Sequence, residues 1–391
     1  MNDLAKRLLS VVNAERVGAR LLKMVQIPSP TGNARAMAEH YAEMLRSVGV
    51  PAELRPLAGH PNSPGVVGRL KGAGAGPTMQ YAGHLDTIHT PHVAPYMAEG
   101  RVYGRGAADM KSGLAAIIET LQVLKDAGVG LPGDLLITAY DMHEHPVGHG
   151  EGCFDLIDAG YVGDAAIVAE GPDDEVAIAG KGTTIFDIEI KSPAGSPHEL
   201  HTEPTQGNAV HAGIRLGQRL IDLAATLSKQ EIPMLGTETL FLSQFHGGDF
   251  FNRLPGSATL GGTRRFAPGR GFAAIQAELQ ALADAAVAGT DLSAKVTLQP
   301  MREGFRQSPD SKLIAVVRAA HREITGREMP LAGQLFGADN EFFVNRGHIP
   351  AVCMGAGLGQ SHADVEWVAV SDVARLTQKI ILSTLKYYDL A

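Results

Sequence analysis

Apolar positions follow two different periods in the first part of the chain, and segments of the two kinds alternate. Residues 34–49 and 114–128 carry apolar side chains at the spacing of one helical face, and each segment ends at a glycine. Mainly apolar runs of strand length lie between and after them, which is typical of strands buried on both faces. The alternation predicts an α/β domain with a mostly parallel sheet covered by helices. The runs of strand length are residues 78–88, 134–143 and 164–171.

From residue 180 to residue 298 the pattern changes. Residues 183–192 alternate apolar and polar side chains with period two, as in a strand with one solvated face, and two helical patterns follow. The segments form the series strand, helix, strand, strand, helix, strand, which predicts a smaller α+β domain. Beyond it the helix and buried-strand pattern returns. We therefore expect one discontinuous domain of residues 1–179 and 299–391, with a smaller domain of residues 180–298 inserted into it.

The composition excludes several classes of function. The 391 residues carry a formal net charge of −8 without a run of Lys or Arg, so neither nucleic acid nor an anionic membrane surface is an expected partner. No window has the roughly 18 uncharged apolar residues of a membrane-spanning helix, and residues 1–22 lack the apolar core of a signal peptide. Cys153 and Cys353 show no disulfide or metal-site spacing. These features predict a cytoplasmic protein.

Acidic and histidine side chains gather at the ends of the predicted strands, where open α/β sheets bind their ligands. They come from five segments that lie far apart in the sequence, and imidazole and carboxylate together suit zinc, manganese or cobalt. We expect one or two divalent ions per chain, with zinc preferred to manganese or cobalt, and a carboxylate such as Asp109 can bridge two ions. The residues are His84, Asp109, the triplet 143–145, Glu170 and His362.

His84 and Asp86 lie two residues apart at the end of one predicted strand, in the stretch YAGHLDT. Residues two apart on a strand point to the same face, so the Asp86 carboxylate can accept the proton of the second ring nitrogen of His84. Such a partner fixes the tautomer of a metal-binding histidine and raises its basicity. We therefore expect His84 to be a ligand and Asp86 to orient it.

Three other motifs carry no function of their own. The glycines of GAGAG (72–76) precede a strand and not a helix, so they do not form a dinucleotide site. The stretch HEHPVGH (143–149) lacks the second histidine of HExxH, because position 147 is valine, and Pro146 breaks the helix that motif needs. No GxSxG elbow is present, which leaves a serine triad without support.

At these residues the sequence resembles the metallopeptidase M20 family, which includes acetylornithine deacetylase, succinyl-diaminopimelate desuccinylase, aminoacylase-1 and glutamate carboxypeptidases. The resemblance extends over nearly the whole chain. Four motifs carry it in the order that the family shows, namely YAGHLDT, GRGAADMKSG, IVAEGP and GLGQSHADVEWVAVSDV. The resemblance implies a dimetal hydrolase of amide bonds with an inserted lid domain through which the protein forms a homodimer.

The resemblance also implies roles for individual residues. His84, Asp109, Glu170 and His362 would be metal ligands, and Asp109 would bridge. In the lid, His198 and His201 are both candidates for the histidine that stabilises the tetrahedral oxyanion, often across the dimer. Lid strands of the family supply an asparagine and an arginine to the substrate, which correspond here to Asn252 and Arg264. The loop GADNEFF, which begins at Gly337, matches a glycine loop that contacts the substrate carboxylate.

The sequence departs from the family after the third predicted strand. The family has two adjacent glutamates there, the first a general base and the second a metal ligand, whereas this chain has His143, Glu144 and His145. Either Glu144 is the base and His145 replaces the ligand, or Glu144 is the ligand and His143 replaces the base. We prefer the first assignment, because imidazole is a common metal ligand and a carboxylate suits proton abstraction beside cations.

The expected reaction is hydrolysis of an amide bond in a small molecule, such as an N-acyl amino acid or a dipeptide, by a metal-activated water molecule with Glu144 as general base. Two alternatives remain open. One is a hydrolytic deaminase of another C–N bond, which would release ammonia in place of an acyl product. The other is a catalytically silent, metal-dependent binding protein, which would turn over no amide.

Overall fold

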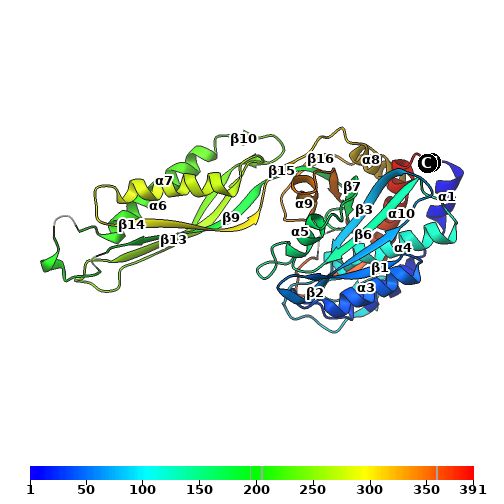
Figure 1. Cartoon of the computed structure of the whole chain (residues 1–391), viewed down its shortest axis with the longest axis horizontal. Helices are drawn as coiled ribbons and strands as arrows, with labels where there is room; N and C mark the ends of the chain where they lie inside the picture. Colours follow the sequence, from blue (N-terminus) through cyan, green and yellow to red (C-terminus); the bar gives the residue numbers. More distant parts are fainter. Residues whose placement is uncertain (194, 204–205, 358–359) are drawn as a thin grey trace. The chain divides into compact units, whose positions relative to one another are not determined.

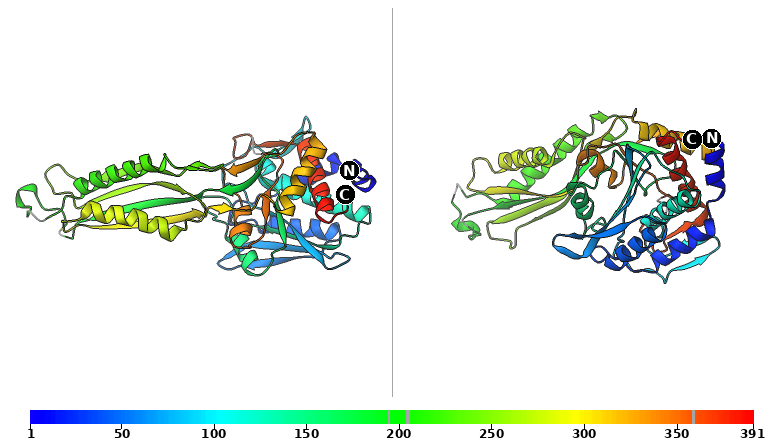
Figure 2. Two further views of the ribbon diagram at one scale, coloured as in Figure 1. Left: turned by 90° about the horizontal axis from the view of Figure 1, so that it is seen from above. Right: turned by 45° about the vertical axis from the view of Figure 1, so that its right-hand side comes forward.

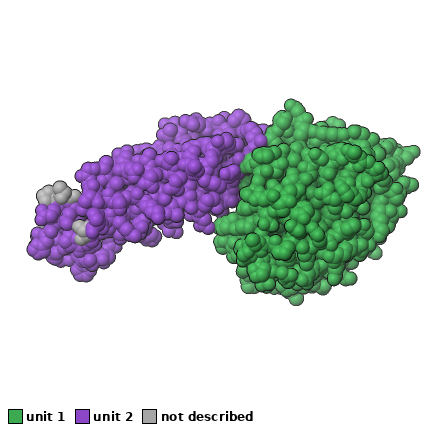
Figure 3. Space-filling model, in the orientation of Figure 1, with its two compact units in different colours: residues 1–178, 307–332, 338–391 green, residues 179–306, 333–337 purple. Residues whose placement is uncertain are grey.

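The structure is a computed structural model, and it describes residues 1–193, 195–203, 206–357 and 360–391. The chain forms two compact units, which Figure 3 distinguishes by colour. The first, called the catalytic unit below, comprises residues 1–178, 307–332 and 338–391, and the second, called the lid, comprises residues 179–306 and 333–337. The second boundary lies later than the predicted residue 298, because the last lid strand continues to Arg302.

The catalytic unit is built on a mixed sheet with the strand order β1-β2-β6-β3-β7-β17 (Figure 1). Strands β6, β3, β7 and β17 are mutually parallel, whereas β2 is antiparallel to both β6 and β1. Only β2 therefore runs against the others, as the mostly parallel prediction requires. The strands are β1 (Ala52–Leu57), β2 (His60–Leu70), β3 (Gly76–His84), β6 (Gly133–Tyr140), β7 (Ala165–Val168) and β17 (Ala351–Cys353).

Helices cover both faces of this sheet, which buries the continuous apolar runs of its strands. Helix α4 is apolar around almost its whole circumference, and it is enclosed by α2, α10 and β3. On the other face α5 packs on β2 and β6, and α9 packs on β7 and β17. The helices are α1 (Asp3–Ser10), α2 (Ala14–Val25), α3 (Arg35–Ser47), α4 (Ser112–Asp126), α5 (Glu151–Asp158), α8 (Lys312–Thr325), α9 (Asn340–Asn345) and α10 (Val370–Tyr387).

The lid is an antiparallel sheet with the order β12-β13-β9-β14, and α6 and α7 lie side by side over one of its faces (Figures 1 and 2). Strand β9 alternates buried and more exposed residues, so one face packs on the helices and the other faces outward. This arrangement has the order of elements that the sequence predicts. The elements are β9 (Gly182–Lys191), α6 (Ala209–Leu227), β12 (Thr239–Gly247), β13 (Ser257–Phe266), α7 (Phe272–Val287) and β14 (Ser293–Arg302).

Short strands complete the described ranges. They form two three-stranded sheets and one two-stranded ribbon. The sheets are β15 (Phe305–Arg306), β8 (Val176–Gly180) and β16 (Leu331–Gln334), and β18 (Trp367–Ala369), β5 (Arg101–Tyr103) and β4 (Tyr96–Ala98); the ribbon is β10 (Glu231–Ile232) with β11 (Gly236–Thr237).

The described helices include none with both the length and the apolar character that crossing a bilayer requires. Cys153 and Cys353 are buried free thiols. The two ends of the chain lie close together in the catalytic unit (Figure 2), where the Asn2 side-chain amide donates a 2.8 Å hydrogen bond to the carbonyl oxygen of Leu390.

Candidate active site

The carboxyl ends of three neighbouring parallel strands bring most of the predicted residues together. His84 is the last residue of β3 and pairs in register with Tyr140, the last residue of β6. His143 and Glu144 follow β6 by three and four residues, and Glu170 follows β7 by two residues. The carboxyl ends of parallel strands lie at the same edge of a sheet. Side chains that follow the neighbouring strands β6, β3 and β7 therefore lie close together.

Asp109 comes from outside the sheet, in a short kinked segment, η1 (Ala107–Lys111), which leads into α4 and whose backbone is not helical at Asp109. One carboxylate oxygen, Oδ1, lies 3.1 Å from Nε2 of His84, and the other, Oδ2, lies 3.5 Å from Nε2 of His362. Each oxygen of Asp109 thus faces a different histidine. This is the arrangement expected of a carboxylate that bridges two cations.

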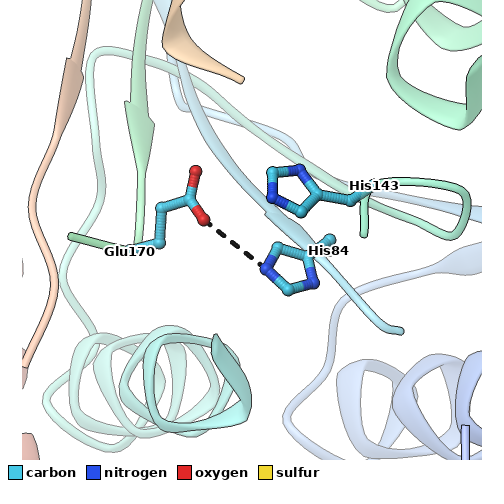
Figure 4. A group of neighbouring side chains, drawn as sticks. All are labelled: His84, His143 and Glu170. Atoms are coloured by element: carbon cyan, nitrogen blue, oxygen red, sulfur yellow. Dashed lines mark ion pairs between the residues drawn. The ribbon is translucent and has the colours of Figure 1, made fainter. Parts of the chain in front are cut away.

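Two groups of side chains have the geometry of metal ligands within the described ranges. The first is His84, His143 and Glu170 (Figure 4), and the second is His84, Asp109 and Glu144; in each group the ligand atoms lie within 4.8 Å of one another. His362 extends the second group, because its Nε2 lies 3.1 Å from Oε1 of Glu144. The two groups share His84, and Asp109 belongs to the second of them.

The donor set fits divalent cations. The carboxylates of Asp109, Glu144 and Glu170 face imidazoles in a largely buried cluster, and buried anions need compensating positive charge. Hydrogen bonds that His362 donates to Asp109 and Glu144 raise the pKa of His362 to about 10. Burial opposes ionisation of Asp109, but hydrogen bonds with His362 and His84 outweigh it and lower the pKa of Asp109. The cluster therefore attracts positive charge, as a site for Zn²⁺, Mn²⁺ or Co²⁺ must.

Asp86 supports the site differently from the prediction. The Nδ1–H of His84 donates to the backbone carbonyl of Asp86 at 3.0 Å, while the Asp86 carboxylate lies 3.6 Å from the same nitrogen. That carboxylate instead accepts backbone N–H bonds from His143 at 3.1 Å and Glu144 at 3.0 Å. Asp86 thus fixes the tautomer of His84 through its main chain and holds the next loop through its side chain.

The structure does not place His145 in the cluster, contrary to the preferred assignment. Its side chain is exposed and packs edge-on against the ring of His149, because the chain turns away from the sheet at residues 145–148. Glu144 instead lies beside His362 and is buried. The geometry favours the other assignment, in which Glu144 is a ligand and His143 occupies the position of the base.

His143 lies in a constrained environment that includes Asp339. Its ring stacks on that of His84 with centroids 4.0 Å apart and planes 3° from parallel, and its Nδ1 lies 2.8 Å from Oδ2 of Asp339. Burial opposes protonation of His143, but the charges of Asp339 and Glu170 and the hydrogen bond to Asp339 together outweigh it and raise the pKa of His143. The sequence pointed to the loop GADNEFF but not to Asp339, since its pairing with His143 depends on tertiary contact.

A second residue that the sequence analysis missed is Glu366, four positions after His362. Its carboxylate accepts the backbone N–H groups of Ala108 at 2.9 Å and Asp109 at 3.2 Å, and it pairs with Arg105 at 2.9 Å. Glu366 therefore holds the turn that carries the bridging carboxylate. Its position in the motif SHADVEW was the available signal.

In the lid, His198, His201 and Asn252 lie close together. Nδ2 of Asn252 lies 3.1 Å from Nε2 of His198, and the ring centroids of the two histidines lie 5.9 Å apart. The two histidines follow Lys191, the last residue of β9. The chain enters the lid sheet at Gly182, the other end of this strand. At roughly 3.3 Å per residue, the ten-residue strand separates them from that entry by about 30 Å.

Arg264 does not have the exposed position that a substrate-binding residue needs. Its side chain is fully buried, and its guanidinium pairs with Glu238 and, at 3.1 Å, with Glu278. Because side chains alternate along β13, the neighbouring Arg265 faces the other side and is exposed. Arg264 thus stabilises the lid.

Gly337 is the remaining predicted site residue. A Cβ added at this position would lie 3.5 Å from Nε of Arg302, which is an ordinary van der Waals contact.

Comparison with known proteins identifies a family. A family model described as peptidase family M20/M25/M40 matches residues 81–384. N-formyl-4-amino-5-aminomethyl-2-methylpyrimidine deformylase of Bacillus subtilis (strain 168) is 31% identical over 208 residues, 50% of this chain and 46% of the relative. That match spans about half the length of the deformylase.

Other similar proteins align over more of their length. Succinyl-diaminopimelate desuccinylase of Rhodospirillum rubrum is 26% identical over 333 residues, 78% of this chain and 81% of the relative. Among solved structures, aminopeptidase PepT from Bacillus cereus ATCC 10987 superposes with a TM-score of 0.81 at 19% identity, covering 96% of this chain and 99% of that chain. The superposition shows that the two chains share a fold.

Proposed function

Since the chain belongs to peptidase family M20/M25/M40, whose model matches residues 81–384, we propose that it hydrolyses an amide bond of a small molecule in a metal-dependent reaction. The sequence predicted this family, the α/β fold and a metallohydrolase of C–N amide bonds, and all three are confirmed. The observation that carries the proposal is the position of Asp109, whose two carboxylate oxygens face His84 and His362 within one cluster of candidate ligands. The comparisons lend no support to a deaminase or a silent binding protein.

The side chains suit two metal positions. His84, Asp109 and Glu170 would hold one ion, and Asp109, Glu144 and His362 would hold the other, with zinc preferred to manganese or cobalt. Divalent ions there supply Lewis-acid polarisation of the substrate carbonyl and acidify a water molecule. Asp109 faces both positions, and Glu366 fixes its backbone.

His143 has the geometry of the general base. Its ring is buried and stacks on the ring of His84, which would hold an ion. Contact of Nδ1 with Asp339 leaves Nε2 available. In this proposal Nε2 of His143 takes a proton from the attacking water and returns it to the departing amine.

Removal of metal is expected to reduce amide hydrolysis to background without unfolding the protein, because the sheet is held by its own apolar core. The measurement combines elemental analysis, circular dichroism and turnover of formyl, acetyl and succinyl amides and dipeptides before and after chelation. Restoration by Zn²⁺, Mn²⁺ or Co²⁺ would support the proposal. Full turnover by metal-free protein would contradict it, and ammonia release without an acyl product would indicate a deaminase.

We also propose a homodimer formed through the lid. Strand β12 is at the edge of the lid sheet and exposes Phe241 and Phe245, and the neighbouring helix α6 exposes Ile214 and Ile221. An exposed apolar edge strand is a surface that pairs with another chain. The lid histidines, about 30 Å along β9 from the entry into the lid, are then available to the other protomer.

The dimer predicts that Phe241→Lys combined with Ile221→Glu shifts the protein to monomers, because both charges would be buried in the interface. Light scattering coupled to size-exclusion chromatography measures the mass. Val11→Lys, at an exposed apolar residue of the catalytic unit, is the matched control and should leave the mass unchanged. A wild-type protein that is monomeric at micromolar concentration would refute the dimer.

A cytoplasmic location and the absence of nucleic-acid and membrane partners complete the proposal. The net charge of −8 gives no attraction for phosphate. Cys153 and Cys353 are free thiols, which suits a reducing compartment.

A further inference from the structure

Asp339 connects two parts of the site from a loop that lies almost two hundred residues further along the chain. Its side chain is fully buried, and Oδ2 lies 2.8 Å from Nδ1 of His143. Its backbone N–H donates to Oε1 of Glu170 at 3.3 Å. One residue therefore contacts both the group placed as the base and a group placed as a ligand.

The position of Asp339 would ordinarily give its carboxylate another task. Asp339 is the N-cap residue of α9, where an aspartate usually accepts a backbone N–H of the first helical turn. Here the side chain makes no capping hydrogen bond. The carboxylate is turned to the imidazole, and the helix forgoes a contact worth about 1 kcal/mol.

We propose that Asp339 is a positioning residue that holds His143 as the Nδ1–H tautomer, with Nε2 unprotonated and directed at the attacking water. This inference rests on the proposed function, in which His143 is the base. Stacking on His84 restricts the plane of the ring, and the hydrogen bond to Asp339 restricts its rotation within that plane. Together they leave His143 one orientation and one tautomer.

The pairing also accounts for the departure from the glutamate pair of the family. A neutral His143 in place of a glutamate removes one negative charge beside the cations, and Asp339 returns one negative charge behind the ring. The pair of residues thus carries the charge of a single glutamate. The atom that accepts the proton is then an imidazole nitrogen of His143. The negative charge lies on Asp339, on the other side of the His143 ring from this nitrogen.

The test compares Asp339→Asn and Asp339→Ala with wild type in kcat, KM, bound metal and the proton resonance of the His143 Nδ1–H. That resonance is observed in metal-free protein with ¹⁵N-labelled histidine and assigned by its loss in His143→Gln. We expect Asp339→Asn to lower kcat by about 10- to 100-fold, with KM and metal content unchanged. The downfield Nδ1–H resonance should disappear in Asp339→Ala.

Asp158→Asn is the matched control, because it removes the ion pair of Asp158 with Arg346 at the other end of α9 and leaves His143 untouched. It should keep both kcat and the resonance. The double variant Asp339→Asn with His143→Gln should be no slower than His143→Gln alone, since the two residues act as one unit.

Wild-type kcat in Asp339→Asn, or an unchanged Nδ1–H resonance in Asp339→Ala, would overturn the inference. A drop in kcat that Asp158→Asn shares would also overturn it, because loosening of α9 would then be the cause. The resonance does not depend on metal or turnover. Failure of the proposed function, seen as a wild type without amide hydrolysis, is therefore distinguishable from failure of this contact.

Discussion

Replacing Asp109 by asparagine is expected to remove both ions and to lower turnover by at least about 10³-fold, the equivalent of several kcal/mol of transition-state stabilisation. The reason is the position of Asp109 between two histidines, with one oxygen 3.1 Å from His84 and the other 3.5 Å from His362. An asparagine offers one oxygen and no charge. The measurement is metal per subunit by elemental analysis together with kcat under saturating Zn²⁺.

The control for this prediction is Asp134→Asn. Asp134 lies near the start of β6, at the end of the strand away from the site, and pairs with Arg69 and Lys71. Its loss should leave metal content and turnover unchanged. Glu170→Gln is a graded comparison, because it removes a ligand from one group only and should cost one ion first. Two tightly bound ions in Asp109→Asn would contradict the bridging arrangement.

The site was predictable from the sequence where it depends on strand order alone. Each of His84, Glu144 and Glu170 follows an apolar run of strand length, and parallel strands place such ends at one edge of the sheet. The alternation of helical and strand segments supplied the parallel arrangement. Local pattern therefore fixed which residues meet.

The sequence could not supply what depends on the direction of a single side chain. Arg264 and Arg265 are neighbours on β13, and a difference of one residue exchanges the buried face for the exposed face. The sequence also does not show which histidine of residues 143–145 is buried in the site. The turn after Glu144 leaves His143 buried and His145 exposed. Asp339 pairs with His143 across 196 positions, and no period in the sequence encodes such a contact.

The two assignments of residues 143–145 predict opposite effects of substitutions on metal content and kcat. The expected change in kcat is the second largest after that of Asp109→Asn. His143→Gln is expected to retain both ions and to lower kcat by about 10²- to 10⁴-fold, the range for loss of a general base. Glu144→Gln is expected to lose the ion held with His362, because the two side chains lie 3.1 Å apart. Elemental analysis and kcat are measured on the same preparations.

His145→Ala is the control in this series, since His145 is exposed and outside both ligand groups of the described residues. It should match wild type in metal content and turnover. If His145→Ala lost an ion while Glu144→Gln kept both and lost turnover, Glu144 would be the base and His145 its neighbouring ligand. That outcome would overturn the arrangement seen in the structure.

His143→Glu distinguishes a base from a ligand at this position. It places two carboxylates next to each other, and a glutamate at the base position accepts a proton without an orienting hydrogen bond to Asp339. We expect it to recover part of the turnover that His143→Gln loses. Asp339 would then face a second carboxylate, so Asp339→Asn should improve His143→Glu although it impairs the wild type. An equal loss in both backgrounds would mean that Asp339 acts on the fold and not through His143.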